Sequence, residues 1–291
     1  VVLGTTACGK SGLGVELARR FDGEIVSADS RQVYKGLDLG TGKVTEEEME
    51  GVPHHMLDVV EPNQPYSVAD FQAGAYTAID DILARGRTPF LVGGTGLYVR
   101  AVTEGFTFTD ARPDPALRAE LEGKTTEELY ALLREKTGVT LTGGEENNRH
   151  RLMRSVEKAL SGRWESPPPC PRYDCLLLGV TFPREEVCRR IDARLQARID
   201  AGMLDEVAEL RANGATDAFL EGLGLEYRYI LRYLTGQIPT LDGLRDELGR
   251  AIKRFAKRQM VWFKKDRDVL WLDMEGDFLA QAVRAVEGFL A

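Results

Sequence analysis

The sequence predicts an α/β fold in which helices flank a parallel sheet and an all-helical segment is inserted. Short apolar strands alternate with helices over the first third of the chain. A glycine-rich loop that contains a lysine lies between the first strand and the first helix, and strand patterns are missing from residues 111–172. Alternating strands and helices form parallel sheets, which bind ligands at the carboxyl ends of their strands.

The loop after the first strand is the clearest chemical signal in the chain. It follows Val2 and Leu3 and reads G-x-x-x-x-G-K-S, the pattern of a phosphate-binding P-loop. Apolar residues at helical spacing come directly after it, so the motif has its strand-loop-helix context. It predicts a P-loop NTPase-like core that binds a di- or triphosphate, with ATP among the candidates. The expected phosphate ligands are Gly4, Thr5, Thr6, Ala7, Cys8, Gly9, Lys10 and Ser11, and the Ser11 hydroxyl is also the expected ligand of Mg²⁺.

Two later strands also end at candidate site residues. Residues 24–28 are predicted to form a strand that ends at Asp29. Residues 70–85 have a helical apolar period, and residues 89–92 form a strand that runs into a glycine-rich turn at Thr95. The P-loop, Asp29 and Thr95 are therefore expected at the same edge of the sheet.

The pattern changes in the middle of the chain. Residues 111–172 are charged and helical in period, and a proline-rich run closes them. We therefore expect a P-loop α/β core over residues 1–110 and 173–291, with a helical insertion over residues 111–172. The later core elements are expected as a strand at 175–182, helices from Arg184 and from Leu204, a basic helix at 250–267 and a last strand near 269–272.

The composition predicts a cytoplasmic protein with no membrane segment. The chain has 291 residues, of which 43% are hydrophobic, enough for one large domain or one domain with an insertion. No stretch approaches the ~20 apolar residues of a membrane span, and no signal peptide is visible. The four cysteines form no C-x-x-C pair and are expected to be reduced thiols. Because almost no strand precedes the P-loop, a few residues are expected before Val1.

The formal net charge of -8 hides two basic clusters. Residues 250–267 combine a helical period with basic and aromatic side chains. The second cluster is Arg149-His150-Arg151 together with Arg154. A solvated helix with an ordinary buried stripe explains the first cluster taken alone. The two clusters together favour a polyanion larger than one nucleotide, such as RNA or DNA.

Asp29 has two possible roles at the end of its strand. It faces whatever lies beyond the phosphates, which suits a catalytic carboxylate, but helix capping or indirect Mg²⁺ ligation suits the position equally. The strand before Thr95 ends without a carboxylate, whereas an NTPase is expected to hold Mg²⁺ through an acidic residue there. That absence weakens the ATPase interpretation. His54-His55 lack a third ligand and are expected to be structural.

Several segments, in order along nearly the whole chain, carry a family resemblance. They are residues 4–11, 27–41, 53–55, 66–71, 91–98 and 256–263. In these segments the chain resembles the tRNA dimethylallyltransferases, also called the tRNA isopentenyltransferase or IPP transferase family. The resemblance implies transfer of a dimethylallyl group from dimethylallyl diphosphate to N6 of adenosine 37 in tRNAs that read codons beginning with U. The implied products are N6-isopentenyladenosine and diphosphate, and the implied cofactor is Mg²⁺.

The resemblance also implies roles for individual residues. Asp29 is the expected general base, and Lys10, Ser11 and Arg194 are the expected catalytic groups at the diphosphate, with Arg198 a weaker alternative to Arg194. The insertion is expected to grip the tRNA anticodon stem-loop, and the enzyme to act as a monomer. The expected tRNA-binding residues are Asp29, Ser30, Arg31, Gln32, Thr95, Arg118, His150, Arg151 and Arg154.

The sequence departs from the family pattern at several positions. Thr5 stands where Pro is usual, and Cys8 where Ser is frequent. Thr-Gly-Lys-Val at residues 41–44 replaces an Ala-Lys-Pro ending, and Gly-Leu-Glu-Tyr at residues 224–227 stands where Gly-Tyr-Lys/Arg-Glu is common. In the last segment a tyrosine and a basic residue have therefore moved or gone.

Three other functions stay open at this point. A P-loop kinase or NTPase acting on a small molecule or RNA predicts an acidic Mg²⁺ ligand and an arginine lid, for which the sequence offers a partial case. Isopentenyltransferases that act on free adenine nucleotides share the P-loop and the Asp, but they typically lack a basic helical insertion. A non-catalytic RNA-binding protein would not need Asp29.

Overall fold

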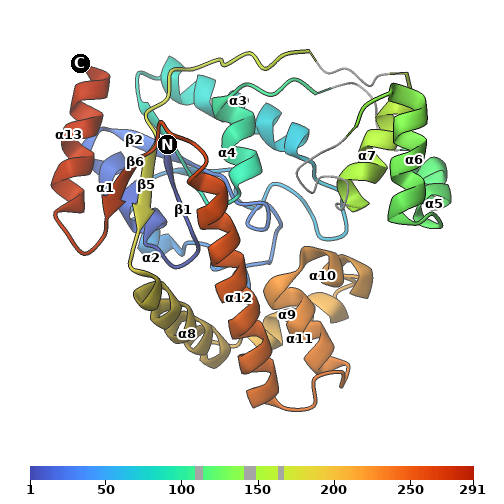
Figure 1. Ribbon diagram of the computed structural model, residues 1–291. Helices are drawn as coiled ribbons and strands as arrows, with labels where there is room; N and C mark the ends of the chain where they lie inside the picture. The colour runs from blue at the N-terminus through green and yellow to red at the C-terminus, as the bar shows by residue number, and fades with distance from the viewer. Residues whose placement is uncertain (109–113, 141–148, 163–166) are drawn as a thin grey trace. The chain divides into compact units, whose positions relative to one another are not determined.

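The computed structural model describes residues 1–108, 114–140, 149–162 and 167–291 (Figure 1). These residues form two compact units. The first comprises Val1–Glu104 and Pro171–Ala291, and the second comprises Gly105–Cys170. The second unit thus begins before residue 111, the predicted start of the insertion, which itself lies outside the described residues.

A six-stranded sheet is the centre of the first unit, and all of its strand pairs are parallel. The strand order is β3-β2-β4-β1-β5-β6, so β1 lies between β4 and β5. The chain fills one half of the sheet before β5 begins the other half, which makes the carboxyl end of β1 a topological switch point. The strands are β1 Val2–Gly4, β2 Gly23–Ser27, β3 His54–His55, β4 Thr88–Gly93, β5 Leu178–Thr181 and β6 Leu270–Asp273.

Helices cover both faces of this sheet, which explains why β1 and β2 are buried along their whole lengths. Figure 1 shows α1 (Lys10–Arg20) and α13 (Phe278–Leu290) on one side. It shows α3 (Val68–Ala84), α4 (Gly96–Thr103) and α12 (Leu241–Phe263) on the other. The predicted α/β class and parallel sheet are confirmed. Ser67 and Asp70 form a capping box that sets the start of α3.

The predicted strand over residues 175–182 is wrong at its first residues, since β5 begins at Leu178. Its neighbours explain the difference. Leu178 pairs with Val2 of β1 and with Leu270 of β6, so no regular partner reaches further back. Residues 175–177 are held by individual hydrogen bonds instead, such as the one that the Val1 amino group donates to the Leu176 carbonyl oxygen at 2.8 Å.

The predicted basic helix over residues 250–267 is the second half of a longer helix. α12 begins at Leu241, where the Thr240 hydroxyl accepts a hydrogen bond from the Gly243 amide at 3.1 Å. It ends at Phe263, so the last basic residues lie beyond the helix. The predicted helices from Arg184 and Leu204 are α8 (Arg184–Asp200) and the shorter α9 (Met203–Ala212).

Besides α13, three described helices of this unit were not predicted. α2 (Glu46–Met49) is a single turn between β2 and β3. α10 (Asp217–Leu223) and α11 (Leu225–Leu234) follow α9, separated by Gly224. Gly224 has φ 76°, a left-handed value that breaks what would otherwise be one helix. This break sets the direction of α11, which carries residues of the site described below.

Among its described residues, the second unit has helices but no strand. It contains α5 (Pro115–Glu122), α6 (Thr126–Thr137) and α7 (Arg149–Leu160). Asp114 caps α5, and Thr125 with Glu128 forms a capping box at α6. The unit has its own apolar core of Leu121, Leu129, Leu133, Leu152, Met153 and Val156.

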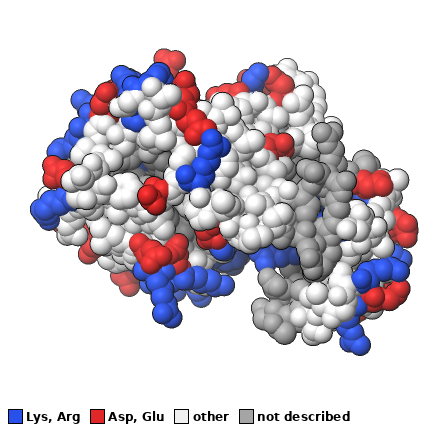
Figure 2. Space-filling model, turned by 90° about the horizontal axis from the view of Figure 1, so that it is seen from above, with Lys and Arg blue, Asp and Glu red and all other residues white. Residues whose placement is uncertain are grey.

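The surface carries many charges of both signs. On the face drawn in Figure 2, acidic and basic side chains are interspersed with uncharged ones. Several of the charges form exposed ion pairs, such as Arg20 with Glu16 and Arg211 with Asp217. Within the described residues, no helix is both long and apolar enough to cross a membrane.

Candidate active site

The P-loop runs from β1 into the first turn of α1. Gly9 has φ 82°, and at Gly4 a β-carbon would lie 2.7 Å from the Val180 carbonyl oxygen, so both glycines are required by the geometry. The Lys10 ammonium donates to the Thr5 carbonyl oxygen at 2.7 Å. Burial lowers the pKa of Lys10 to about 8, an effect that nearby Cys8 and Asp29 oppose and Arg194 adds to.

The side chains of the P-loop divide between the core and a cavity. Thr5 and Cys8 are buried, with the Thr5 hydroxyl oxygen 2.7 Å from the Cys8 sulfur. Thr6, Lys10 and Ser11 line the cavity. The other predicted phosphate ligands, Gly4, Thr5, Ala7, Cys8 and Gly9, are not among the described residues that line it.

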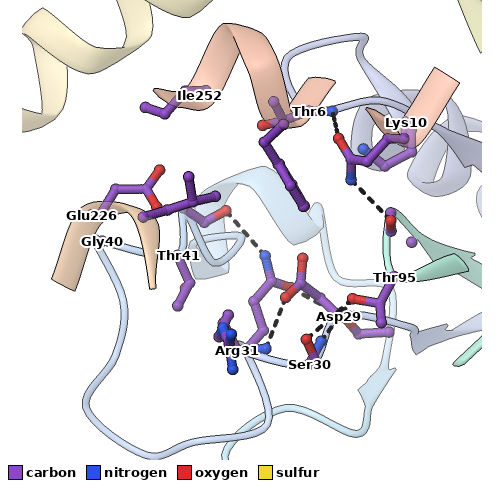
Figure 3. Close-up of a pocket in the computed structure, with 18 of the residues that line it drawn as sticks. Thr6, Lys10, Asp29, Ser30, Arg31, Gly40, Thr41, Thr95, Glu226 and Ile252 are labelled. Atoms are coloured by element: carbon purple, nitrogen blue, oxygen red, sulfur yellow. Dashed lines mark hydrogen bonds between the residues drawn. The ribbon is translucent and has the colours of Figure 1, made fainter. Parts of the chain in front are cut away.

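The cavity has a volume of about 540 Å³ and lies at the carboxyl end of the sheet. The predicted site residues from the P-loop, β2 and β4 meet in it, because parallel neighbouring strands end at the same edge. Figure 3 shows Lys10, Asp29 and Thr95 around it. The predicted residues that line it are Thr6, Lys10, Ser11, Asp29, Ser30, Arg31, Gln32, Thr95, Arg194 and Arg198.

Asp29 and Thr95 are joined through Ser30. The Ser30 amide donates to the Thr95 hydroxyl oxygen at 3.0 Å, and that hydroxyl lies 3.4 Å from the Ser30 hydroxyl (Figure 3). One carboxylate oxygen of Asp29 accepts a hydrogen bond from the Arg31 amide at 2.9 Å. The other carboxylate oxygen has no protein donor among the described contacts, and Asp29 is half-buried at the cavity wall.

Gln32 connects the same segment to the loop that closes the cavity from another side. Its side-chain nitrogen donates to the Gly42 carbonyl oxygen at 3.3 Å, and its oxygen lies 3.1 Å from the Ser27 hydroxyl. Arg194 also donates to the Gly42 carbonyl oxygen, at 3.2 Å. The loop that departs from the family pattern at residues 41–44 is thus attached to two predicted site residues.

Three arginines at helical spacing on α8 point toward the P-loop and the Gly42 loop. Sequence reasoning identified Arg194 and Arg198 but missed Arg190, whose Nε donates to the Ala7 carbonyl oxygen at 2.8 Å. A β-carbon at Gly42 would meet Nη2 of both Arg194 and Arg198, so both guanidinium groups lie against this residue. The i, i+4, i+8 spacing was the available signal.

Sequence reasoning also missed Gln259 as a site residue. Its side-chain oxygen accepts a hydrogen bond from the Thr6 amide at 2.9 Å, and its nitrogen donates to the Gly94 carbonyl oxygen at 2.8 Å (Figure 3). Gln259 thereby joins α12 to the P-loop and to the turn after β4. The signal was a polar residue within the otherwise apolar stripe of the basic helix.

Models of two known protein families match this chain. The family model for IPP transferases matches residues 32–266, and the model for isopentenyl transferases matches residues 1–61. The chain belongs to the IPP transferase family. Its relatives include a tRNA dimethylallyltransferase 2 of Shewanella sediminis, 43% identical, with 97% of this chain and 95% of that protein covered. A tRNA dimethylallyltransferase of Symbiobacterium thermophilum is 42% identical and covers 95% of this chain.

Solved members of the IPP transferase family share the fold. The tRNA isopentenylpyrophosphate transferase of Bacillus halodurans is 37% identical and superimposes with a TM-score of 0.74, covering 99% of this chain and 94% of its own. A eukaryotic dimethylallyltransferase whose structures show it acting on tRNA is 25% identical and has a TM-score of 0.80, covering 99% of this chain and 77% of its own.

In the second unit, two of the predicted tRNA-binding arginines share one buried partner. Both oxygens of Glu157, a residue only 3% exposed, accept hydrogen bonds from Arg118, at 2.9 and 3.2 Å. Arg154 donates to the same carboxylate at 3.1 Å. Arg151 is exposed on α7, and the side chain of His150 lies outside the described residues.

The basic helix also contributes to the cavity. Phe255, Arg258 and Trp262 line it together with Gln259. The basic residues Arg254 and Lys257 line an adjoining shallow groove with Val261 and Lys265, and Arg258 and Trp262 line both the groove and the cavity. One helix therefore carries both part of the site and part of the basic surface.

Proposed function

We propose that this chain transfers a dimethylallyl group from dimethylallyl diphosphate to N6 of adenosine 37 in tRNAs that read codons beginning with U. The products are N6-isopentenyladenosine and diphosphate, and the reaction takes place in the cytoplasm. One observation carries the proposal: the Asp29 carboxylate, with one oxygen that has no protein donor among the described contacts, lines the same cavity as Lys10 and Ser11 of the P-loop. Membership of the IPP transferase family supports it.

The P-loop side of the cavity binds the leaving group. As the bond between the allylic carbon and oxygen breaks, its electron pair goes to the diphosphate, where negative charge grows. Lys10 and Arg194, together with the amides at the start of α1, stabilise that charge. No acidic residue lies in the first turn of α1 to repel the diphosphate.

Asp29 is the general base. The exocyclic N6 amine of adenine forms a bond to the allylic carbon and must lose a proton, which passes to the free carboxylate oxygen of Asp29. The Arg31 amide holds the other oxygen, so the carboxylate keeps a fixed orientation. Thr95 and Ser30 orient the adenine beside it.

The donor set at the P-loop fits Mg²⁺. Oxygen donors are its preferred ligands, and it usually takes one or two from protein and the rest from phosphates and water. Ser11 is exposed at the start of α1 and lines the cavity, so its hydroxyl would hold the ion. Among the described residues, no three His, Cys, Asp or Glu side chains form a ligand cluster, which suits an ion carried by the diphosphate. When bound, Mg²⁺ supplies positive charge to the leaving group.

The acceptor base must leave the anticodon stack to reach this cavity. Arg31, Gln32 and Thr95 line the wall where a flipped adenine would lie. Arg118, His150, Arg151 and Arg154 in the second unit grip the anticodon stem-loop through its phosphates. The enzyme acts as a monomer.

The test is transfer of radiolabel from dimethylallyl diphosphate to an anticodon stem-loop that carries adenosine at positions 36 to 38. Free AMP serves as a parallel acceptor. Label on the stem-loop alone is expected. Label on AMP would identify an enzyme of free nucleotides, and label on neither, with ATP hydrolysis instead, would favour a kinase or NTPase.

A further inference from the structure

The cavity contains a carboxylate for which the proposed reaction has no use. Glu226, near the start of α11, lines the cavity with its side chain 15% exposed. Figure 3 shows it next to Gly40, on the opposite side of the view from Thr95. Its partner is Arg198 of α8, whose Nη1 lies 3.6 Å from Glu226 Oε1, and whose side chain is 14% exposed.

The fold does not need this carboxylate to hold α11 in place. The next residue does that, since the buried Tyr227 hydroxyl donates to Glu206 of α9 at 3.0 Å. Glu206 in turn accepts hydrogen bonds from the amides of Asp38, Leu39 and Gly40. Burying a carboxylate costs several kcal/mol, which an ion pair at 3.6 Å seldom offsets. Burial accordingly raises the pKa of Glu226, although Arg198 opposes the shift.

The charge of Glu226 has a clear effect on the cavity. Arg194 and Arg198 lie against the same residue, Gly42, so two guanidinium groups are adjacent. Lys10, Arg31, Arg228 and Arg258 add further positive charge to the lining, and Asp29 is the other carboxylate among the described lining residues. Without Glu226, Arg198 would be an uncompensated cation beside Arg194. With it, one of the two arginines is neutralised.

We propose that Glu226 is a positioning residue that limits the affinity of the cavity for phosphate anions. By pairing with Arg198, it leaves Lys10 and Arg194 as the cations that bind a diphosphate. The diphosphate product can therefore dissociate, and Arg198 is not available to bind the further negative charge of a triphosphate. The inference rests on the proposed function, because it takes the bound anion to be the prenyl diphosphate and its product.

The experiment measures binding of inorganic diphosphate and of ATP, each with Mg²⁺, to the full chain by calorimetry. Glu226→Gln keeps the shape of the side chain and removes its charge. We expect this variant to bind diphosphate about fivefold more tightly than the wild type at low salt, with a larger gain for ATP and a steeper salt dependence. In prenyl transfer, kcat and KM for dimethylallyl diphosphate are expected to fall together because product release slows. Unchanged or weaker diphosphate binding would overturn the proposal.

Three further variants separate charge from structure. Glu16→Gln is the matched control, because Glu16 pairs with Arg20 and neither residue lines the cavity, so it is expected to leave diphosphate affinity unchanged. Glu226→Asp keeps the charge and is expected to keep wild-type affinity. The double variant Glu226→Gln/Arg198→Gln should return to wild-type affinity. Persistently tight binding there would show that Glu226 does not act through Arg198.

If Glu226→Gln does not fold, as judged by thermal melting, Arg198→Gln replaces it. This change leaves Glu226 unpaired in the cavity, and diphosphate binding is expected to weaken about tenfold, whereas equal affinity would overturn the proposal. Diphosphate binding is measured without prenyl transfer. If the wild-type chain binds diphosphate but prenylates no RNA, the proposed function is refuted. If the wild type prenylates tRNA, but Glu226→Gln binds diphosphate with the same affinity as the wild type, this inference alone is refuted.

Discussion

The side-chain oxygen of Gln259 accepts a hydrogen bond from the Thr6 amide at 2.9 Å, so the C-terminal part of the chain holds the phosphate-binding loop directly. The same side chain donates to the Gly94 carbonyl oxygen at 2.8 Å. One amide group thus fixes the spacing between the P-loop, the turn after β4 and α12. The two residues of the first contact are 253 positions apart in the sequence.

Replacing Gln259 by Ala is expected to lower kcat/KM strongly and the free energy of unfolding only slightly. Loss of the two hydrogen bonds should lower the free energy of unfolding by about 1–2 kcal/mol, since Thr6 and Gly94 both line the cavity, where water can reach the groups left behind. A misplaced P-loop should lower kcat/KM for prenyl transfer by about 10²-fold. Gln281→Ala, at an exposed position of α13, is the control. Equal kcat/KM in the two variants would show that Gln259 does not position the loop.

Asp29→Asn is expected to retain tRNA binding and lose turnover. The amide keeps the shape of the carboxylate but cannot accept the proton, so kcat should fall by about 10²- to 10⁴-fold. Filter binding of tRNA and single-turnover prenyl transfer measure the two properties separately. Asp246→Asn on the exposed face of α12 should behave as the wild type. An Asp29→Asn enzyme within a few-fold of wild-type kcat would remove Asp29 from the role of base.

The pKa of Lys10 predicts a limit at alkaline pH. Because burial lowers this pKa to about 8, the free enzyme loses the Lys10 charge as the pH rises through that value. The kcat/KM for dimethylallyl diphosphate should therefore decline above about pH 8. Lys10→Arg keeps its charge to far higher pH and should lose this decline, whatever its absolute rate. The same decline in both enzymes would assign it to another group.

The ion pairs of Glu24 lead us to expect that the protein loses stability in acid. This buried carboxylate, 2% exposed, accepts hydrogen bonds from Arg85 and from Arg87, each at 2.8 Å, and lies 2.7 Å from His55 Nε2. Arg85 first, and then His55 and Arg87, hold the pKa of Glu24 well below its usual value, against the effect of burial. A lowered folded-state pKa stabilises the protein above the unfolded value of ~4.3, and this stabilisation is lost progressively as the pH falls from there toward the folded-state pKa.

Glu24→Gln should therefore destabilise the protein by about 2–3 kcal/mol at neutral pH and by much less in acid. Urea unfolding at several pH values measures the difference. The control is Glu16→Gln, which breaks the exposed pair with Arg20 and should change stability by less than about 0.5 kcal/mol. A destabilisation by Glu24→Gln that does not depend on pH would refute the ionic explanation.

The basic face of α7 is expected to bind RNA phosphates. Replacing Arg151 and Arg154 together by Ala should weaken binding of the anticodon stem-loop and reduce the slope of log Kd against log salt by about 1–2. Arg134→Ala with Lys136→Ala, two exposed basic residues of α6 in the same unit, removes equal charge as a control. A slope that stays at the wild-type value would refute the assignment of the clamp to α7.

The sequence alone determined those parts of the protein that depend on local chemistry. The P-loop, the parallel α/β core and the meeting of Asp29 with Thr95 could all be predicted. Glycine spacing and helical period are local features of the sequence. The edge at which parallel strands end follows from the alternation of strands and helices along the chain. The ends of β5 and α12 could not be predicted as well, because β5 begins where its neighbours β1 and β6 supply partners, and Thr240 caps α12 before the basic pattern starts.

Only the tertiary structure decided which distant side chains complete the site. Gln259 reaches Thr6, Arg190 reaches Ala7, and Glu226 reaches Arg198 across separate helices. The local sequence pattern around each of these residues gives at most a weak signal of its role, since a polar or charged side chain on a helix is most often solvated. Their roles arise because the sheet brings strand ends to one edge and α8, α11 and α12 pack around it, which buries these groups beside one another. Burial and proximity, rather than residue type, make their charges and hydrogen bonds matter.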